Sequence, residues 1–193
     1  MALLLAVTLA VGCRGEPRAE DVGPRRVRVL FLGHGSEHHD SGRYAPMLAA
    51  ALGQDGIDVF YTEDPGALNP DNLARYDALI VYANHDSITA DQEEALLDYV
   101  DSGHGFLPIH SASYCFRNSD AYVELVGAQF LEHGTGRFTA TIVDGDHPVM
   151  EGMEEFETWD ETYVHHRHNP DRTVLMVREG AEREPWTWVR TRG

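Results

Sequence analysis

Histidine and acidic side chains gather in five short clusters along this sequence of 193 residues. Imidazole nitrogens and carboxylate oxygens bind zinc or manganese, and both groups also act as general acids and bases. The clusters therefore fit either a metal site or a site of proton transfer. They are residues 33–40 (GHGSEHHD), 84–86 (NHD), 110–113 (HSAS), 130–133 (FLEH) and 159–163 (WDETY).

None of the clusters is a complete motif by its own spacing. The HExxH pattern of zinc peptidases is absent from the sequence. His34 and His38 are four residues apart, but Gly33 and Gly35 flank His34 and argue against a helix there. A structural or surface role is the simpler interpretation of any single histidine. The elements that position the clusters therefore decide how the residues are interpreted.

Those elements alternate between strands and helices in the first two thirds of the chain. Continuous apolar runs predict buried strands, and capping signals such as Thr89 with Gln92 predict the starts of helices. This alternation predicts an α/β fold with a doubly wound, mainly parallel sheet of the flavodoxin-like kind. The predicted strands are 27–32, 58–61, 77–83 and 105–110, and the predicted helices are 44–52, a short one from 69–70, 90–100 and 119–126.

The position of the clusters along these strands predicts where a ligand binds. In open α/β sheets the ligand site lies outside the carboxyl ends of the strands, and the first three clusters each follow a predicted strand. In the last third, residues 137–143, 173–177 and 186–189 predict further strands. The remainder of that third, including the fifth cluster, is predicted to be irregular.

The composition excludes one class of partner. Hydrophobic residues make up 42% of the chain and charged residues 24%, which is ordinary for a globular protein. Asp and Glu number 32 against 15 Lys and Arg, a formal net charge of -17. Such a surface repels phosphate backbones, so nucleic acid is excluded as a partner.

The N-terminus predicts export. Residues 1–12 are uncharged and apolar, about the length of a signal-peptide core, and Cys13 follows at once. The pattern is typical of a bacterial lipoprotein signal, with Cys13 as the lipid anchor and a location in the cell envelope or periplasm. A cleaved secretory signal with an incidental cysteine is the alternative. We divide the chain into a signal (1–13), a linker (14–25) and one domain (26–193).

Five motifs in register resemble the ThuA-like (trehalose utilisation) family over about residues 27–190. They are 33–40, 103–112 (GHGFLPIHSA), 127–133 (GAQFLEH), 146–148 (DHP) and 160–163 (DETY). The resemblance implies a fold similar to class I glutamine amidotransferases, in which the turn after the fourth strand presents a catalytic cysteine. Here His110 occupies that place and Cys115 comes five residues later. An imidazole does not replace a thiolate in thioester chemistry, so we expect no glutaminase activity.

The same resemblance implies a role in carbohydrate metabolism. We expect an enzyme or enzyme component acting on trehalose or a related glycoside, beside a partner oxidoreductase. A non-catalytic sugar-binding or docking domain is the alternative. The candidate catalytic residues are His110, Glu161 and Asp160; the candidate substrate-binding residues are His39, Asp40, Ser111, His133, Trp159 and Tyr163; and the candidate ligands of a divalent metal are His39, His110 and His133.

The C-terminus departs from the family pattern. Family members usually continue beyond the strand at 186–189 with a further strand and a Gly-His motif, whereas this sequence ends at Gly193. We therefore expect an apparently truncated C-terminal end with an exposed sheet edge.

Overall fold

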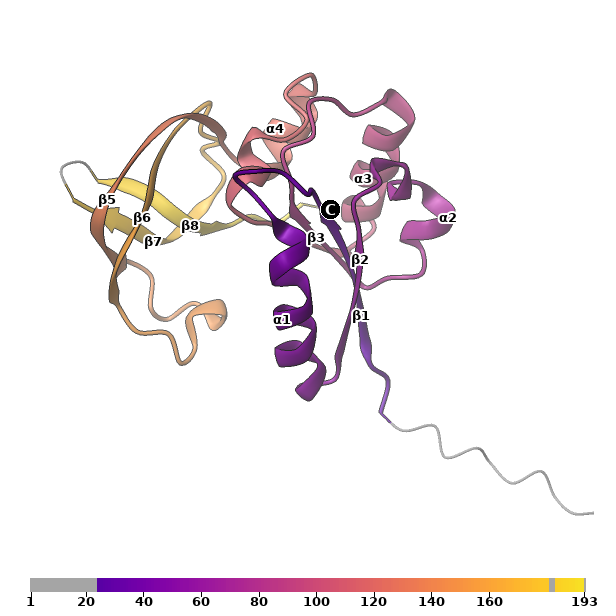
Figure 1. Ribbon diagram of the computed structural model, residues 1–193, viewed down its shortest axis with the longest axis horizontal. Coiled ribbons are helices and arrows are strands. Elements are labelled where there is room, and N and C mark those ends of the chain that lie inside the picture. The colour runs from indigo at the N-terminus through magenta and orange to yellow at the C-terminus, as the bar shows by residue number, and fades with distance from the viewer. Residues whose placement is uncertain (1–23, 181–182, 193) are drawn as a thin grey trace, which may run out of the picture.

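The computed structural model describes residues 24–180 and 183–192 (Figure 1). The predicted export signal, with Cys13, and most of the predicted linker lie outside the described residues. Within the described part of the chain, no helix combines the length and the apolar character that crossing a membrane requires.

The first half of the chain builds a four-stranded parallel sheet. Its strand order is β2-β1-β3-β4, so β1 and β3 are the two central strands. Residues 29–33 of β1 and 79–81 of β3 are buried, as the sequence predicted, whereas Val27 at the start of β1 is 42% exposed. Pro108 fits the last strand because β4 is at the edge of the sheet, where a missing N–H costs little. The strands are β1 (Val27–Gly33), β2 (Ile57–Thr62), β3 (Ala78–Tyr82) and β4 (Gly105–Pro108).

Side chains from this sheet are buried on both of its faces. Alternate residues of β1 point in opposite directions: Phe31 packs with Ala45 of α1, and Leu30 and Leu32 pack in a larger cluster that includes Leu96 of α3. The doubly wound α/β class is therefore confirmed. The helices are α1 (Ser41–Gln54), α2 (Pro70–Leu73), α3 (Ala90–Asp101) and α4 (Asp120–Val126), with short 3-10 turns η1 (Pro65–Ala67), η2 (His110–Tyr114) and η3 (Pro148–Met150).

The predicted helix starts are present. The Thr89 hydroxyl accepts a hydrogen bond from the Gln92 backbone N–H, and the Gln92 side chain accepts one from Thr89 N–H. Asn69 caps α2 in the same way, with Pro70 in the first turn. These capping side chains accept hydrogen bonds from backbone N–H groups that have no partner within the helix. The signals are local in sequence, so they act independently of the tertiary structure.

The last third of the chain forms a second, antiparallel sheet of order β6-β5-β7-β8. The prediction of irregular structure is wrong for residues 156–166, which form β6, and the strand predicted at 137–143 begins already at 129. Polar residues and glycines dominate both segments, so neither has an apolar run. The strands are β5 (Gln129–Ile142), β6 (Phe156–His166), β7 (Thr173–Glu179) and β8 (Glu184–Val189).

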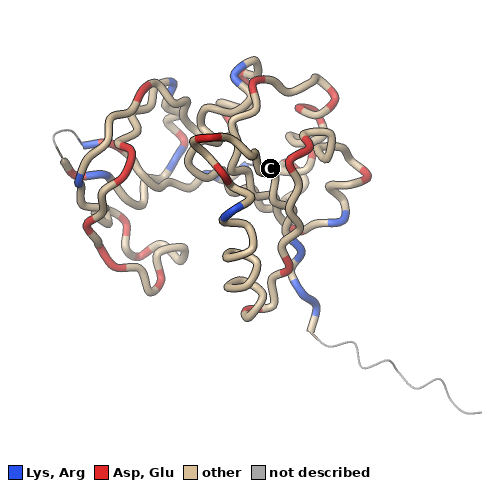
Figure 2. Tube along the Cα trace, in the orientation of Figure 1, with Lys and Arg blue, Asp and Glu red and all other residues tan. Residues whose placement is uncertain are grey.

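The antiparallel sheet lies beside the carboxyl ends of the parallel strands, to the left in Figure 1. It has a small core of its own around Met150, Leu175 and Met176. Trp188 of β8 packs on the main core, and its Nε1–H donates a hydrogen bond of 2.8 Å to Val126 O at the end of α4. Asp and Glu are spread over both sheets and their helices (Figure 2).

Candidate functional site

His110 stands at the turn between β4 and η2, with a backbone φ of 51°. Residues other than glycine adopt this left-handed conformation uncommonly, because the Cβ crowds the backbone, although histidine does so more often than most. Residues held in such conformations concentrate at active sites, and the nucleophiles of related α/β folds stand on comparable strand-to-helix turns. The turn therefore displays His110 as a catalytic elbow would display its nucleophile.

His39 reaches the same place from the loop between β1 and α1. The loop is closed by a bridge between Gly35 and Asp40, and the His39 backbone N–H donates a 3.0 Å hydrogen bond to Ser36 Oγ. The His39 ring then packs edge-on against His110, with ring centroids 4.9 Å apart. Two loops that follow different strands of the parallel sheet thus place two imidazoles side by side.

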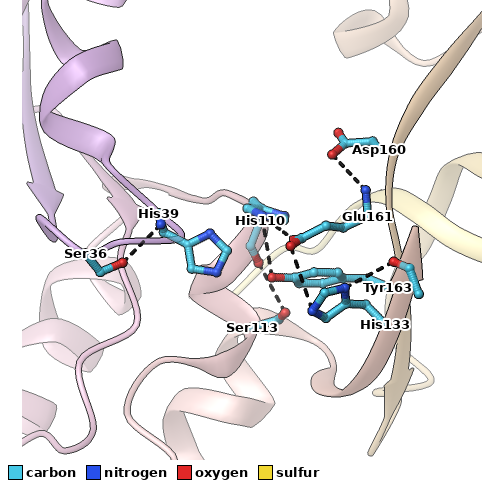
Figure 3. Close-up of polar contacts among 9 residues, drawn as sticks. Ser36, His39, His110, Ser113, His133, Asp160, Glu161 and Tyr163 are labelled. Atoms are coloured by element: carbon cyan, nitrogen blue, oxygen red, sulfur yellow. Dashed lines mark hydrogen bonds and ion pairs between the residues drawn. The ribbon is translucent and has the colours of Figure 1, made fainter. Parts of the chain in front are cut away.

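The other side of the site comes from one face of the β5–β6 pair. Successive side chains of a strand alternate between faces, so Trp159, Glu161 and Tyr163 share a face of β6. His133 of β5 stands directly opposite Tyr163 in the antiparallel register and therefore shares that face. This face is turned toward His110 (Figure 3).

The Glu161 carboxylate joins the two sides. Its Oε2 lies 3.1 Å from His110 Nε2, and its Oε1 lies 3.8 Å from His133 Nε2. The Tyr163 hydroxyl lies 3.5 Å from the same His110 nitrogen, and the Tyr163 and His110 rings are 4.5 Å apart. Figure 3 shows His110 between His39 and this group.

Burial sets the protonation of the site. It lowers the pKa of His110 below 6.5, with Glu161 opposing the shift, and it lowers the pKa of His39, with His110 adding to the effect. Both rings are therefore neutral at pH 7. Burial and the Glu161 carboxylate raise the pKa of Tyr163, so that hydroxyl remains protonated. The site thus contains neutral nitrogen acceptors, one carboxylate and one phenolic donor.

Three of the predicted residues do not join this group. The Asp160 carboxylate accepts a 2.8 Å hydrogen bond from the Glu161 backbone N–H (Figure 3). It forms no ion pair with an imidazole among the described residues, but its charge adds to that of Glu161 in opposing the lowered pKa of His110. Asp40 caps helix α1 by accepting from Arg43 N–H. Ser111 is fully buried, and among the described residues its Oγ has no hydrogen-bond partner. Trp159 is 65% exposed at the rim.

Tyr82 belongs to the site although the sequence analysis did not select it. Its ring lies 5.8 Å from that of His110 and 6.3 Å from that of His39, and Tyr44 packs beside it. It is the last residue of β3, so the rule that sites lie at the carboxyl ends of strands was the signal. The rule was applied to residues 84–86 instead, where His85 stacks on His34 and supports the loop.

Comparison with known families agrees with the motif resemblance. The family model described as trehalose utilisation, ThuA, matches residues 28–193. The chain belongs to the ThuA family. A ThuA-like protein of Bacteroides uniformis, described as putative, superposes with a TM-score of 0.72 at 20% identity, covering 90% of this chain and 81% of that one. A similarly described protein of Parabacteroides merdae gives 0.71 at 16% identity, covering 84% and 74%.

The fold also resembles a glutamine amidotransferase of Thermotoga maritima, with a TM-score of 0.55 at 16% identity over 86% of this chain and 72% of that one. These likenesses confirm the fold. In sequence, no curated protein matches significantly. In this ThuA chain, the turn between β4 and η2 carries His110. Cys115 is buried, and burial raises the pKa of its thiol to about 12.

Proposed function

We propose that this ThuA domain binds a glycoside at the surface formed by His110, Glu161 and their neighbours, and transfers a proton to or from it. The contact of 3.1 Å between His110 Nε2 and Glu161 Oε2 carries the proposal. It joins a neutral nitrogen base to a carboxylate across two sheets, an arrangement suited to general acid–base chemistry.

Each polar group has a role that its surroundings support. His110 Nε2, neutral at pH 7, accepts a proton from a sugar hydroxyl or from a carbon next to a carbonyl group. The Glu161 carboxylate stabilises the imidazolium that forms. Tyr163, whose pKa is raised, stays a hydrogen-bond donor toward a sugar oxygen.

Exposed aromatic rings support a sugar as the ligand. Trp159 is 65% exposed on the same face of β6 as Glu161, and Tyr44 is 44% exposed beside Tyr82. The apolar C–H faces of a sugar ring pack on aromatic faces, and its hydroxyl groups pair with carboxylates and imidazoles. The family description, trehalose utilisation, favours glycosides of this class.

A non-catalytic glycoside-binding domain is the second candidate. The exposure of Trp159 favours it, because a stacking residue so open to solvent supports binding without enclosing a reaction. Neither candidate includes glutamine hydrolysis, since the thiol nearest the elbow is buried and protonated.

The test uses two neighbouring carboxylates on β6. Trehalose and a panel of disaccharides and their keto forms are screened for turnover by mass spectrometry and for binding by calorimetry. We expect Glu161→Gln to lower kcat by at least about 100-fold, the usual contribution of an acid–base group. Asp160→Asn, which changes a carboxylate that acts on His110 only through its charge, should lower kcat much less.

The outcomes separate the candidates. Binding without turnover, weakened by Trp159→Ala, establishes the binding domain and removes the catalytic proposal. If the Glu161→Gln and Asp160→Asn variants are equally active, or if no glycoside binds, the proposal of a glycoside site at His110 and Glu161 is wrong. Ammonia released from glutamine by the unaltered protein contradicts the expected lack of glutaminase activity, and a His110→Cys change alone should not create that activity.

A further inference from the structure

We propose that His39, His110 and Glu161 form a binding site for one divalent transition-metal ion, zinc in the first instance. One donor atom from each of the three side chains lies within 4.8 Å of the other two. Sequence analysis placed His133 third in this set, but the structure puts the Glu161 carboxylate there and leaves His133 behind it.

The spacing of the donors suits a shared ion. Bonds from zinc to imidazole nitrogen or carboxylate oxygen are about 2.0 to 2.2 Å long, so two ligands of one ion lie about 3 to 4.4 Å apart. His110 Nε2 and Glu161 Oε2, at 3.1 Å, already have the separation of adjacent ligands. A rotation of the His39 ring that moves its donor by about half an ångström brings the widest pair into that range.

The His110–Glu161 contact is unlike an ordinary histidine–glutamate pair. Glu161 Oε2 is buried and has no partner in hydrogen-bonding geometry among the described residues, despite the 3.1 Å approach. In the same protein, His165 Nδ1 and Glu184 Oε1 approach to 3.3 Å and do form a hydrogen bond. His110 Nε2 and Glu161 Oε2 are thus close together without being directed at each other. Two ligands of a common ion are arranged in the same way.

His39 shows the same lack of a partner. Its Nδ1 is buried without a hydrogen bond within the described part of the chain, while its backbone is fixed by Ser36. A buried polar atom left unpaired costs about 1 to 3 kcal/mol, so such atoms usually have a ligand, an ion or water as partner. One ion between the three side chains would satisfy both unpaired atoms.

The surroundings favour a site that keeps a free coordination position. His133 contacts the second oxygen of Glu161 and so supports the ligand from behind, as outer residues of metal sites do. Two imidazoles and one carboxylate are a ligand set that leaves room for a water or a substrate oxygen on zinc. In the proposed function, a sugar oxygen would take that position and be polarised by the ion. With zinc bound, His110 Nε2 would hold the ion instead of accepting a proton.

The experiment measures zinc directly and does not depend on a sugar. The chain, freed of any affinity tag and treated with a chelator, is titrated with Zn²⁺ by calorimetry and with Co²⁺ by visible absorption. We expect one ion per chain. His39→Ala, His110→Ala and Glu161→Gln should each weaken zinc binding by at least about tenfold. Even substitutions of residues that only hydrogen-bond to the metal ligands cost about tenfold or more in affinity, so loss of a ligand should cost at least as much.

His38→Ala and His168→Ala are the matched controls. Both histidines are exposed, and His38 is the neighbour of His39 in the same loop, so these variants should bind zinc as the unaltered protein does. Added Zn²⁺ should raise the Tm of the unaltered protein and of both controls but not of the three ligand variants, which also checks that the latter are folded.

Two results overturn the inference. One is the absence of bound Zn²⁺ or Co²⁺ at micromolar concentrations, and the other is equal affinity in the ligand variants and the controls. The fate of the proposed function is separate: a chain that binds zinc but no glycoside keeps the metal site and loses that function. A chain that binds a glycoside but no metal keeps the proposed function and loses the metal site.

Discussion

The two sheets of this protein place chemical groups in different ways. The strands of the parallel sheet are covered on both faces: Phe31 and Leu32 of β1 and Leu79 and Val81 of β3 have no exposed surface. Such strands have no room for polar side chains along their length, so their reactive groups stand in the loops at their carboxyl ends. His39 and His110 are both placed in this way.

The antiparallel sheet instead carries its groups in the middle of strands. Glu161, Tyr163 and His133 lie within β6 and β5, on the face that is turned toward His110. One buried and one free face allow polar and apolar residues to alternate. A site between two such sheets therefore combines side chains on loops, here His39 and His110, with side chains whose positions are fixed by the pairing of β-strands. Three matched pairs of substitutions test whether the sheets differ as described.

Truncating one phenylalanine in each sheet should give the largest contrast. Phe31 is completely buried and packs with Tyr61 at 5.4 Å, whereas Phe156 of β6 is 40% exposed. We expect Phe31→Ala to lower the free energy of unfolding by about 3 to 5 kcal/mol. Phe156→Ala should cost less than about 1.5 kcal/mol, because much of its surface already meets water. Urea unfolding measures both, and equal losses would contradict the contrast.

Adding one methyl group should have a smaller effect that again depends on the sheet. A Cβ at Gly33, where β1 ends, would lie 2.2 Å from Tyr61 Cε2 and 2.4 Å from Ser41 Oγ. We expect Gly33→Ala to cost about 1 to 3 kcal/mol, the usual cost of overpacking, and to displace the loop that carries His39.

Gly136 of β5 is the matched control for that change. Its added Cβ would meet Thr162 Cγ2 at an ordinary 3.8 Å, so Gly136→Ala should stay within about 0.5 kcal/mol of the unaltered protein. Chemical unfolding gives the energies, and zinc or glycoside binding reports on the loop. A tolerated Gly33→Ala with unchanged binding would show that the end of β1 is less tightly packed than described.

The smallest contrast concerns polar contacts at the surface. Thr89 closes a capping box at the start of α3, and Thr89→Ala should cost about 1 kcal/mol because the Gln92 backbone N–H loses its acceptor. Arg137 of β5 pairs with Glu157 of β6 at 2.8 Å, but both side chains are more than half exposed. Arg137→Ala should therefore change the unfolding energy by no more than about 0.5 kcal/mol. A larger loss for Arg137 than for Thr89 would reverse the expected order.

The parallel half was predictable from the sequence because its signals are local. Residues 29–32 form a continuous apolar run and are all buried, and the Thr89 capping box depends on four consecutive residues. The edge position of Pro108 also agrees with the residue itself, since proline has no N–H to donate. Each of these patterns identifies its element without reference to distant parts of the chain.

The antiparallel half was not predictable in the same way. Residues 156–166 are mostly polar with a few aromatic side chains, and their strand exists through pairing with β5, whose partner residues lie 16 to 37 positions earlier in the chain. The missed strand matters for the site, because it decides which residues share a face. Recognising it would have placed Glu161 and Tyr163 on one face of β6 and the Cβ of Asp160 on the other.

The sequence by itself determined the kind of chemistry and the family. It supplied the imidazoles, the carboxylates and the histidine in place of a cysteine at residue 110, and its motifs assigned the chain to ThuA. Tertiary structure alone decided which groups meet. Whether Glu161 or Asp160 faces His110 depends on strand register, since a shift of one residue turns a side chain to the opposite face. Register is fixed by pairing and packing over the whole sheet, and no short stretch of sequence encodes it.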